Sequence, residues 1–144
     1  MGDVSEAAFI AHISLTQTEV GAVNMGLDIY FYKRDKDNYK HLTELGYFRK
    51  VNFLVKYFNL ENCVDHICTR DEIETLLSKC NSVLERKTES LSDATLPTTA
   101  GFFFGSTDYD DWYYKDIQSV KDTITEALNG WDEDKEELIF HAWW

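Results

Sequence analysis

The strongest constraint on the fold is an amphipathic segment that follows a helix-start signal. Thr69 and Glu72 have the spacing of a capping box, in which each side chain accepts a hydrogen bond from the backbone N–H of the other residue. Apolar residues then recur at helical spacing: Ile73, Leu76, Leu77, Cys80, Val83 and Leu84. Such a helix must bury its apolar face against another layer of secondary structure. The segment therefore predicts a layered domain with a helix over residues 69–84.

A second helix is predicted near the C-terminal end. Thr107 and Asp110 form another capping pair. One face of the residues that follow is apolar: Tyr113, Ile117, Val120, Ile124 and Leu128. Asn129 and Gly130 are a fitting stop, because glycine takes the left-handed conformation at helix ends.

Short apolar and aromatic segments outside these helices predict strands. We expect strands over residues 26–32, 63–68, 102–104 and 138–144. Residues 40–58 are expected to form a helix with a broad apolar arc, covered on more than one side, and residues 87–99 a loop. This order predicts an α+β fold: a small antiparallel or mixed sheet of about four strands with three helices packed on it.

The chain of 144 residues has the length of one domain. We expect residues 25–144 to form a single α+β domain. Residues 1–24 are interpreted as an N-terminal extension, either a helix near residues 5–13 with an edge strand near 15–20 or a loosely held segment.

Three further features predict a cytoplasmic protein. The longest apolar runs fall far short of the ~20 residues that span a bilayer. The first residues carry Asp3 and Glu6 but no Lys or Arg, unlike a signal peptide. Cysteine occurs an odd number of times, at Cys63, Cys68 and Cys80, so reduced thiols are expected.

Charge is distributed unevenly along the chain. The sequence holds 26 acidic and 14 basic residues, a formal net charge of −12. Residues 1–60 are balanced, whereas residues 61–144 hold nineteen acids and seven bases. Such a region repels nucleic acid and attracts basic surfaces, so we expect a partner protein with a basic surface and no direct nucleic-acid binding. The alternative, that the charge only keeps the protein soluble, stays open.

Four segments of residues 25–144 carry a family resemblance. They are Met25 to Tyr30 (Met-Gly-Leu-Asp-Ile-Tyr), Tyr47 to Lys50 (Tyr-Phe-Arg-Lys), Gly101 to Asp110 (Gly-Phe-Phe-Phe-Gly-Ser-Thr-Asp-Tyr-Asp) and the terminus His141 to Trp144. The likeness also runs through residues 69–84. Together these segments resemble a widespread family of small uncharacterised phage and prophage proteins. The resemblance implies a phage-borne protein in the cytosol of a host cell, and no particular reaction.

The segment Gly101 to Thr107 has the layout of an anion-binding turn, with glycines followed by Ser and Thr at a helix start. It lacks the lysine and the spacing of a phosphate loop, and Asp108, Asp110 and Asp111 would repel a phosphate there. The same acids, with Asp116, offer oxygen ligands for magnesium or calcium, but they lack the spacing of an EF-hand. Helix capping explains these acids more simply.

Other chemistries lack a supporting pattern. Alternation along residues 63–68 separates Cys63 from His66 and Cys68, and Cys80 belongs to the apolar face of its helix, so a zinc site is not expected. Ser106 is outside a nucleophile elbow, and no histidine is tied to it by spacing. We therefore predict no catalytic residue, no metal ligand and no cofactor.

The leading hypothesis is a binding protein that presents acids and aromatic rings to a basic partner. Host nucleases and other defence effectors are such partners, and DNA-mimic and anti-CRISPR inhibitors work in this way. Tryptophan and tyrosine are favoured in interfaces. The predicted partner-binding residues are Asp108, Tyr109, Asp110, Asp111, Trp112 and Asp116.

Two alternatives stay open. The first is a homo-oligomeric structural or ligand-sequestering protein, with the apolar arc of residues 40–58 or the final aromatic strand as its interface. The second is a small metal-dependent hydrolase, with the acids between Asp108 and Asp116 as ligands.

Overall fold

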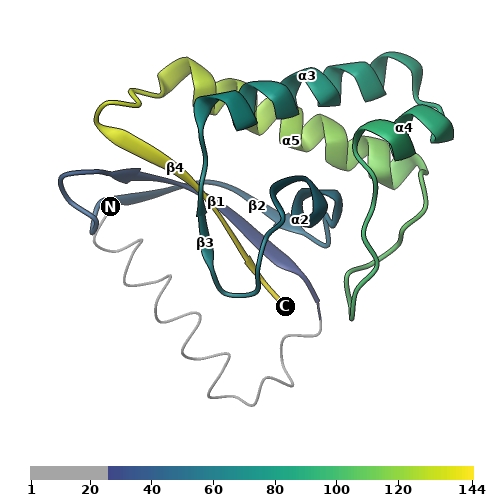
Figure 1. The fold of residues 1–144 in the computed structure, drawn as a ribbon, viewed down its shortest axis with the longest axis horizontal. Helices are drawn as coiled ribbons and strands as arrows, with labels where there is room; N and C mark the ends of the chain where they lie inside the picture. Colours follow the sequence, from purple (N-terminus) through teal and green to yellow (C-terminus); the bar gives the residue numbers. More distant parts are fainter. Residues whose placement is uncertain (1–25) are drawn as a thin grey trace.

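The computed structural model describes residues 26–144. The helix and edge strand predicted within residues 1–24 lie outside this range. One antiparallel sheet has the strand order β2-β1-β4-β3, and its strands are β1 (Asp28–Asp35), β2 (Leu42–Arg49), β3 (Asp65–Ile67) and β4 (Glu136–Trp143). The helices of this range cover one face of the sheet (Figure 1), and they are α2 (Phe53–Phe58), α3 (Arg70–Arg86), α4 (Glu89–Thr95) and α5 (Asp111–Gly130). The predicted α+β class is confirmed.

The helix predicted over residues 40–58 is wrong for most of its length. Residues Leu42–Arg49 form β2, which pairs with β1, and only Phe53–Phe58 is helical. A bulge at Leu45 shifts the register of β2 between its two halves. The apolar residues of a bulged strand and of a short buried helix therefore follow one another at a spacing that resembles the period of a single helix.

The second and the last of the predicted strands are confirmed, with adjusted ends. The final strand begins at Glu136, two residues before the predicted start, and lies between β1 and β3. Within residues 63–68 only Asp65–Ile67 is a strand. Cys63 precedes it with a left-handed backbone, φ 63°.

The predicted helix at residues 69–84 is confirmed, together with its capping box. The Thr69 hydroxyl accepts from the Glu72 N–H at 3.1 Å, and the Glu72 carboxylate accepts from the Thr69 N–H at 2.9 Å. The helix continues to Arg86 and ends at Lys87, whose φ of 52° is left-handed.

The cap of α5 is Asp110 and not Thr107: the Asp110 carboxylate accepts from the Tyr113 N–H at 3.0 Å. The helix ends at Gly130, as predicted, but the left-handed conformation expected there is wrong, because Gly130 is helical and Gly105 is the glycine with positive φ among residues 26–144. Instead, the indole N–H of Trp131 donates to the Glu136 carbonyl across the turn into β4.

Two further predictions are corrected between α3 and α5. Residues 87–99 contain the short helix α4, which begins after Thr88, whose hydroxyl accepts from the Leu91 N–H. Residues 102–104 form no strand. They belong to a loop in which Phe103 has a left-handed backbone, φ 60°.

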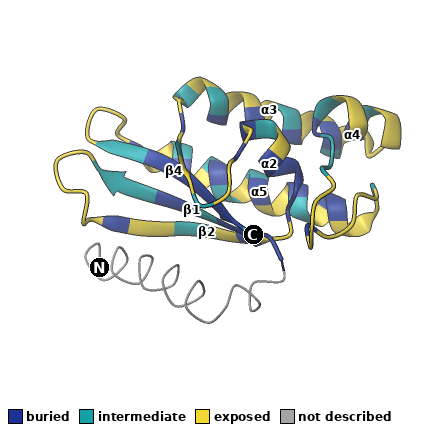
Figure 2. Cartoon of the chain, turned by 60° about the horizontal axis from the view of Figure 1, so that its bottom comes forward, coloured by how far each residue is buried: buried dark blue, intermediate teal, exposed yellow. Residues whose placement is uncertain are grey.

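The main core lies between the sheet and the helices (Figure 2). Phe31 of β1 stacks on Phe140 of β4 at 4.4 Å, and Phe58 of α2 packs on the same ring at 4.6 Å. Helices α3 and α5 contribute their predicted apolar faces, including Ile73 and Ile117, which are fully buried. No helix within residues 26–144 is long and apolar enough to cross a membrane.

Both surfaces predicted for self-association are altered by this architecture. The apolar arc of residues 40–58 is divided between β2 and α2, and the α2 side is buried in the main core. The final strand, β4, has a neighbouring strand on each side, so its backbone edges are paired. The continuous helical arc that the sequence suggested is therefore absent, while the oligomeric state itself stays a prediction.

Candidate functional site

The segment between α4 and α5, residues 97–110, is called here the Phe loop. It extends from the end of α4, turns, and returns to the start of α5 (Figure 1). The buried amide of Asn52, from outside the loop, bonds to backbone groups of both arms of the loop. Its Nδ2 donates to the carbonyls of Phe104 at 3.1 Å and Ser106 at 3.0 Å, and its Oδ1 accepts from the Thr99 N–H at 3.0 Å. Both arms of the loop are therefore joined to the start of α2 through one residue.

The base of the loop is closed by a second set of hydrogen bonds. The Tyr109 hydroxyl donates to the Asp93 carboxylate at 2.6 Å and accepts from the Thr98 N–H at 3.2 Å. The Thr98 hydroxyl donates to the Thr107 carbonyl at 2.9 Å. Because backbone groups of both arms have partners, the loop has a defined conformation without a strand or helix of its own.

Two phenylalanines project from the turn of the loop. Phe102 is 82% exposed and Phe103 is 42% exposed, and their rings meet edge to face at 4.6 Å. The next residue, Phe104, turns inward and packs on Trp144 at 5.1 Å. A left-handed backbone at a bulky residue such as Phe103 costs about 1–2 kcal/mol. The hydrogen bonds of Asn52 and Thr98 offset that cost and keep the Phe102–Phe103 pair in solvent.

The start of α5 carries the third exposed ring. Trp112 is 72% exposed, and the ammonium of Lys115 lies 4.7 Å from the centre of its ring. Asp111 is exposed in the first turn, where a carboxylate complements the helix dipole. Asp116, one turn further on, is half-buried. Burial, followed by the nearby Asp110 carboxylate, raises the pKa of Asp116 to about 6.

A hollow of about 340 Å³ lies between the loop, the start of α5 and the segment from Arg49 to Phe53, which joins β2 to α2. Gly105 and Ser106 of the loop border it together with Trp112 and Asp116 of α5. Lys50 lies on its other side, and a side chain at Gly105 would come within 3.1 Å of the Lys50 Cβ. The hollow thus carries charges of both signs, and the loop and the helix start border one continuous depression.

The structure divides the predicted partner-binding residues into two groups. Asp108, Asp111 and Trp112 are exposed and available to a partner. Asp110 has a structural task as the cap of α5, and Tyr109 closes the base of the loop. Asp116 faces the hollow and is only half-exposed.

Sequence reasoning missed Phe102, Phe103 and Asn52. Three consecutive phenylalanines predicted a buried strand, yet the flanking Gly101 and Gly105 are loop signals. The role of Asn52 has no sequence signal, because its three partners lie about 50 residues further along the chain.

Among residues 26–144 no three His, Cys, Asp or Glu side chains are placed to share a metal ion. The metal-dependent alternative therefore gains no ligand set from this range. Cys68 and Cys80 are buried, and burial raises the pKa of both thiols. His66 bonds instead to the Glu72 carboxylate at 2.9 Å, and His141 to the Asp65 carboxylate at 2.8 Å.

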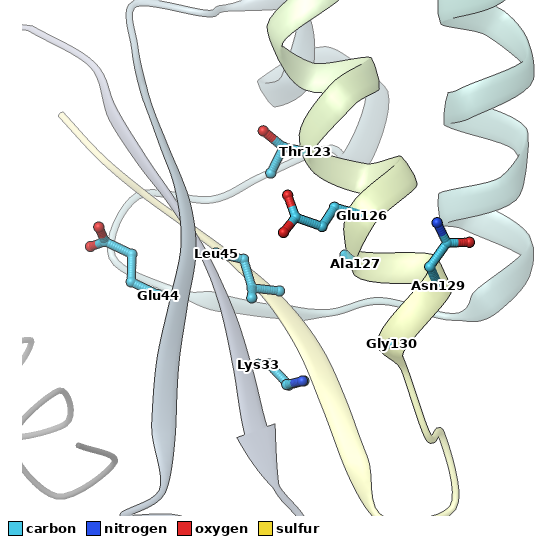
Figure 3. Close-up of a pocket in the computed structure, with 8 residues that line it drawn as sticks. All are labelled: Lys33, Glu44, Leu45, Thr123, Glu126, Ala127, Asn129 and Gly130. Atoms are coloured by element: carbon cyan, nitrogen blue, oxygen red, sulfur yellow. The ribbon is translucent and has the colours of Figure 1, made fainter.

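A larger hollow, about 530 Å³, lies between edge strand β2 and the end of α5 (Figure 3). Leu45 and Ala127 supply its apolar surface. Figure 3 shows the Glu44 carboxylate directed away from α5, while the Lys33 ammonium is paired with Glu136 at 3.5 Å. The polar groups do not converge on a common point, so this hollow offers no defined chemistry.

Comparison with family models, with curated proteins and with solved structures found no match to this chain.

Proposed function

We propose that this chain is a binding protein that docks a partner protein through the exposed part of the Phe loop and the start of α5. Five residues form this surface, called here the loop–helix surface: Phe102, Phe103, Asp108, Asp111 and Trp112. The observation that carries the proposal is the pair of exposed phenylalanines, Phe102 and Phe103, in a loop anchored by Asn52.

The energetics favour docking through these rings. Burying an exposed phenylalanine side chain contributes about 1.5–3 kcal/mol. The hydrogen bonds at Asn52 and Thr98 already fix the loop, so less ordering entropy is lost when a partner binds. Large aromatic side chains surrounded by polar groups are the usual form of an energetic hot spot.

The chemistry of the surface points to a partner with an apolar pocket bordered by basic groups. Asp108 and Asp111 are exposed in the stretch of chain that leads from the two phenylalanines to Trp112, and the chain as a whole has a net charge of −12. The cation already held over Trp112, the Lys115 ammonium, indicates that this ring accepts positive charge on its face. A nucleic acid would be repelled by the same charges.

The resemblance of residues 25–144 to small phage and prophage proteins supplies the biological part of the proposal. In that setting the partner is a host protein with a basic surface, such as a nuclease or another defence effector. The chain would act by occupying the groove that the effector uses for nucleic acid.

The proposal is tested by direct binding between purified proteins. Proteins captured by the tagged full chain at low salt are identified, purified and titrated by calorimetry. Replacing both rings, F102S with F103S, is expected to raise the Kd about 100-fold, because the complex loses the two rings that the partner would bury. The charge reversals D108K with D111K are expected to weaken binding mainly at low salt.

Matched controls lie elsewhere on the surface. Tyr39 is 57% exposed near the β1–β2 turn, and Glu85 and Glu126 are exposed acids of α3 and α5. Tyr39→Ser and the pair E85K with E126K should leave the Kd unchanged. Equal loss of binding in test and control variants, or full binding by F102S with F103S, would contradict the proposal.

A further inference from the structure

Strand β2 lies at one edge of the sheet, and one side of its backbone has no neighbouring strand within the described part of the chain. The Lys50 N–H donates to the Leu27 carbonyl at 2.7 Å, and in an antiparallel pair such bonded positions alternate with positions that face outward. Tyr47 and Arg49 therefore direct their N–H and C=O groups away from β1, and beyond the bulge Glu44 does the same. The edge thus offers backbone donors and acceptors to a further strand.

The hollow of about 530 Å³ lies beside this edge, on the helix side of the sheet (Figure 3). The bulge places both Leu45 and Gly46 on that side, because Gly46 pairs with the inward-facing Phe31. Figure 3 shows the Leu45 side chain directed toward α5, where Ala127 supplies the opposite wall. A strand added to β2 would direct alternate side chains into the hollow. An unpaired edge with a side-chain pocket beside it is the arrangement that binds an extended peptide as an additional strand.

Charge determines which kind of strand fits this edge. Glu44 and Glu126 are exposed beside the hollow, and neither carboxylate has an ion-pair partner within residues 26–144. The Lys33 ammonium, which also borders the hollow, is already paired with Glu136 at 3.5 Å. A second copy of the chain would bring the same acids against each other, and a charged residue within an edge strand is a usual protection against such self-pairing. A strand that carries basic residues is instead attracted by these acids.

We propose that β2 is the docking edge for an extended segment of a partner protein in which apolar and basic residues alternate. The apolar residues enter the hollow between Leu45 and Ala127, and the basic residues lie on the outer side of the sheet, next to Glu44. The segment pairs its backbone with the outward-facing groups of β2. This site lies at the end of α5, whereas the loop–helix surface lies at its start. The two proposals therefore stand or fall separately.

Hydrogen exchange of the full chain, read amide by amide by NMR, tests this proposal with a designed peptide. The probe is Lys-Val-Lys-Leu-Lys-Val-Lys, blocked at both ends. At saturating peptide the N–H groups of Glu44, Tyr47 and Arg49 should exchange about tenfold more slowly, because they become hydrogen-bonded. Strand β3 is the other edge of the same sheet and serves as the internal control. The amides of Asp65 and Ile67 should not change.

Two further peptides separate backbone pairing from charge. One has Glu in place of every Lys, and the other has Pro in place of the central Leu, which removes a backbone donor. Both should bind at least about tenfold more weakly than the probe. In the protein, E44K with E126K should raise the Kd of the probe about tenfold. The control E61K with E85K, which reverses two exposed acids elsewhere, should match the wild type at about 0.15 M salt.

Several outcomes would overturn the proposal. Equal binding of the proline peptide would show that backbone pairing is not involved, and protection of Asp65 and Ile67 in place of β2 would assign the site to the other edge. Slow exchange at Glu44 and Tyr47 in the protein alone would show that the edge is already occupied. The occupant would be a second copy if the protection disappears on dilution, and another part of the same chain if it persists. Failure of the loop–helix surface to bind a partner would change none of these results.

Discussion

At the scale of single residues, we expect Asn52 to contribute strongly to the free energy of unfolding. It precedes α2 but makes no capping hydrogen bond there, and its buried amide instead bonds three backbone groups of the Phe loop. Asn52→Ala leaves those groups without their partner, so the free energy of unfolding should fall by about 2–3 kcal/mol. Urea denaturation measures this, with Asn81→Ala on the exposed side of α3 as the control. A loss no larger than that of the control would show that the loop is held by other contacts.

Asp116 gives a residue-scale prediction of pH dependence. Its pKa rises from 3.8 in the unfolded chain to about 6 in the fold, so the folded state binds the proton more tightly. The stabilisation that this proton brings is complete below 3.8 and is lost as the pH rises through 6. Asp116→Asn removes the ionised carboxylate, and the variant should be more stable at pH 7.5 by about 1 kcal/mol, after discounting for solvent at a half-exposed site.

The gain from Asp116→Asn should vanish at pH 4, where the wild-type carboxyl is protonated in the fold. Unfolding curves for both proteins at the two pH values check this, and Glu126→Gln at an exposed site of α5 is the control. A variant that is equally stabilised at both pH values would mean that shape, rather than charge, explains the difference.

At the scale of elements, the capping box of α3 should contribute measurably to stability. Thr69→Ala removes the acceptor for the Glu72 N–H, and caps of this kind contribute about 1 kcal/mol. Thr75→Ala, in the exposed middle of the same helix, should cost nothing or stabilise slightly, because alanine has the higher helix propensity. Thermal unfolding separates the two variants. Equal melting temperatures for both variants would show that the cap does not contribute to the stability of the protein.

The two long helices could be predicted from sequence because their signals are local. The Thr69–Glu72 box and the apolar spacing after it fix α3, and the apolar stripe after Asp110 fixes α5. Caps and 3.6-residue periodicity are properties of neighbouring residues, so they survive without knowledge of the tertiary contacts.

The segments that could not be predicted depend on distant contacts. Strand β2 was predicted as part of a helix because the bulge at Leu45 breaks the two-residue alternation of side chains that is typical of a strand. Phe102 and Phe103 were expected in a buried strand, and they are exposed because Asn52 and Tyr109 hold the loop. For the candidate site, the sequence predicted the acids and Trp112, which stay predictions, and it did not indicate the two exposed rings or Asn52, which positions them.

At the scale of the whole molecule, net charge should govern how fast the partner is found. A chain of charge −12 is attracted to a basic partner over distances comparable to the Debye length. Raising the salt concentration should therefore slow association strongly and change dissociation little, since the buried rings control release. Stopped-flow association at two salt concentrations measures this. An association rate that does not change with salt concentration would contradict the proposal that the partner has a basic surface.

The central claim, that the Phe loop contacts a partner protein, is tested most directly by site-specific photo-crosslinking. A photoreactive phenylalanine analogue is placed at position 102 of the full chain, or at the exposed position 39 as a control, and the protein is irradiated in host lysate. We predict one dominant protein adduct from position 102, absent from position 39 and lost when Asp108 and Asp111 are reversed to lysine. The same adducts from both positions, or none from position 102, would contradict the account.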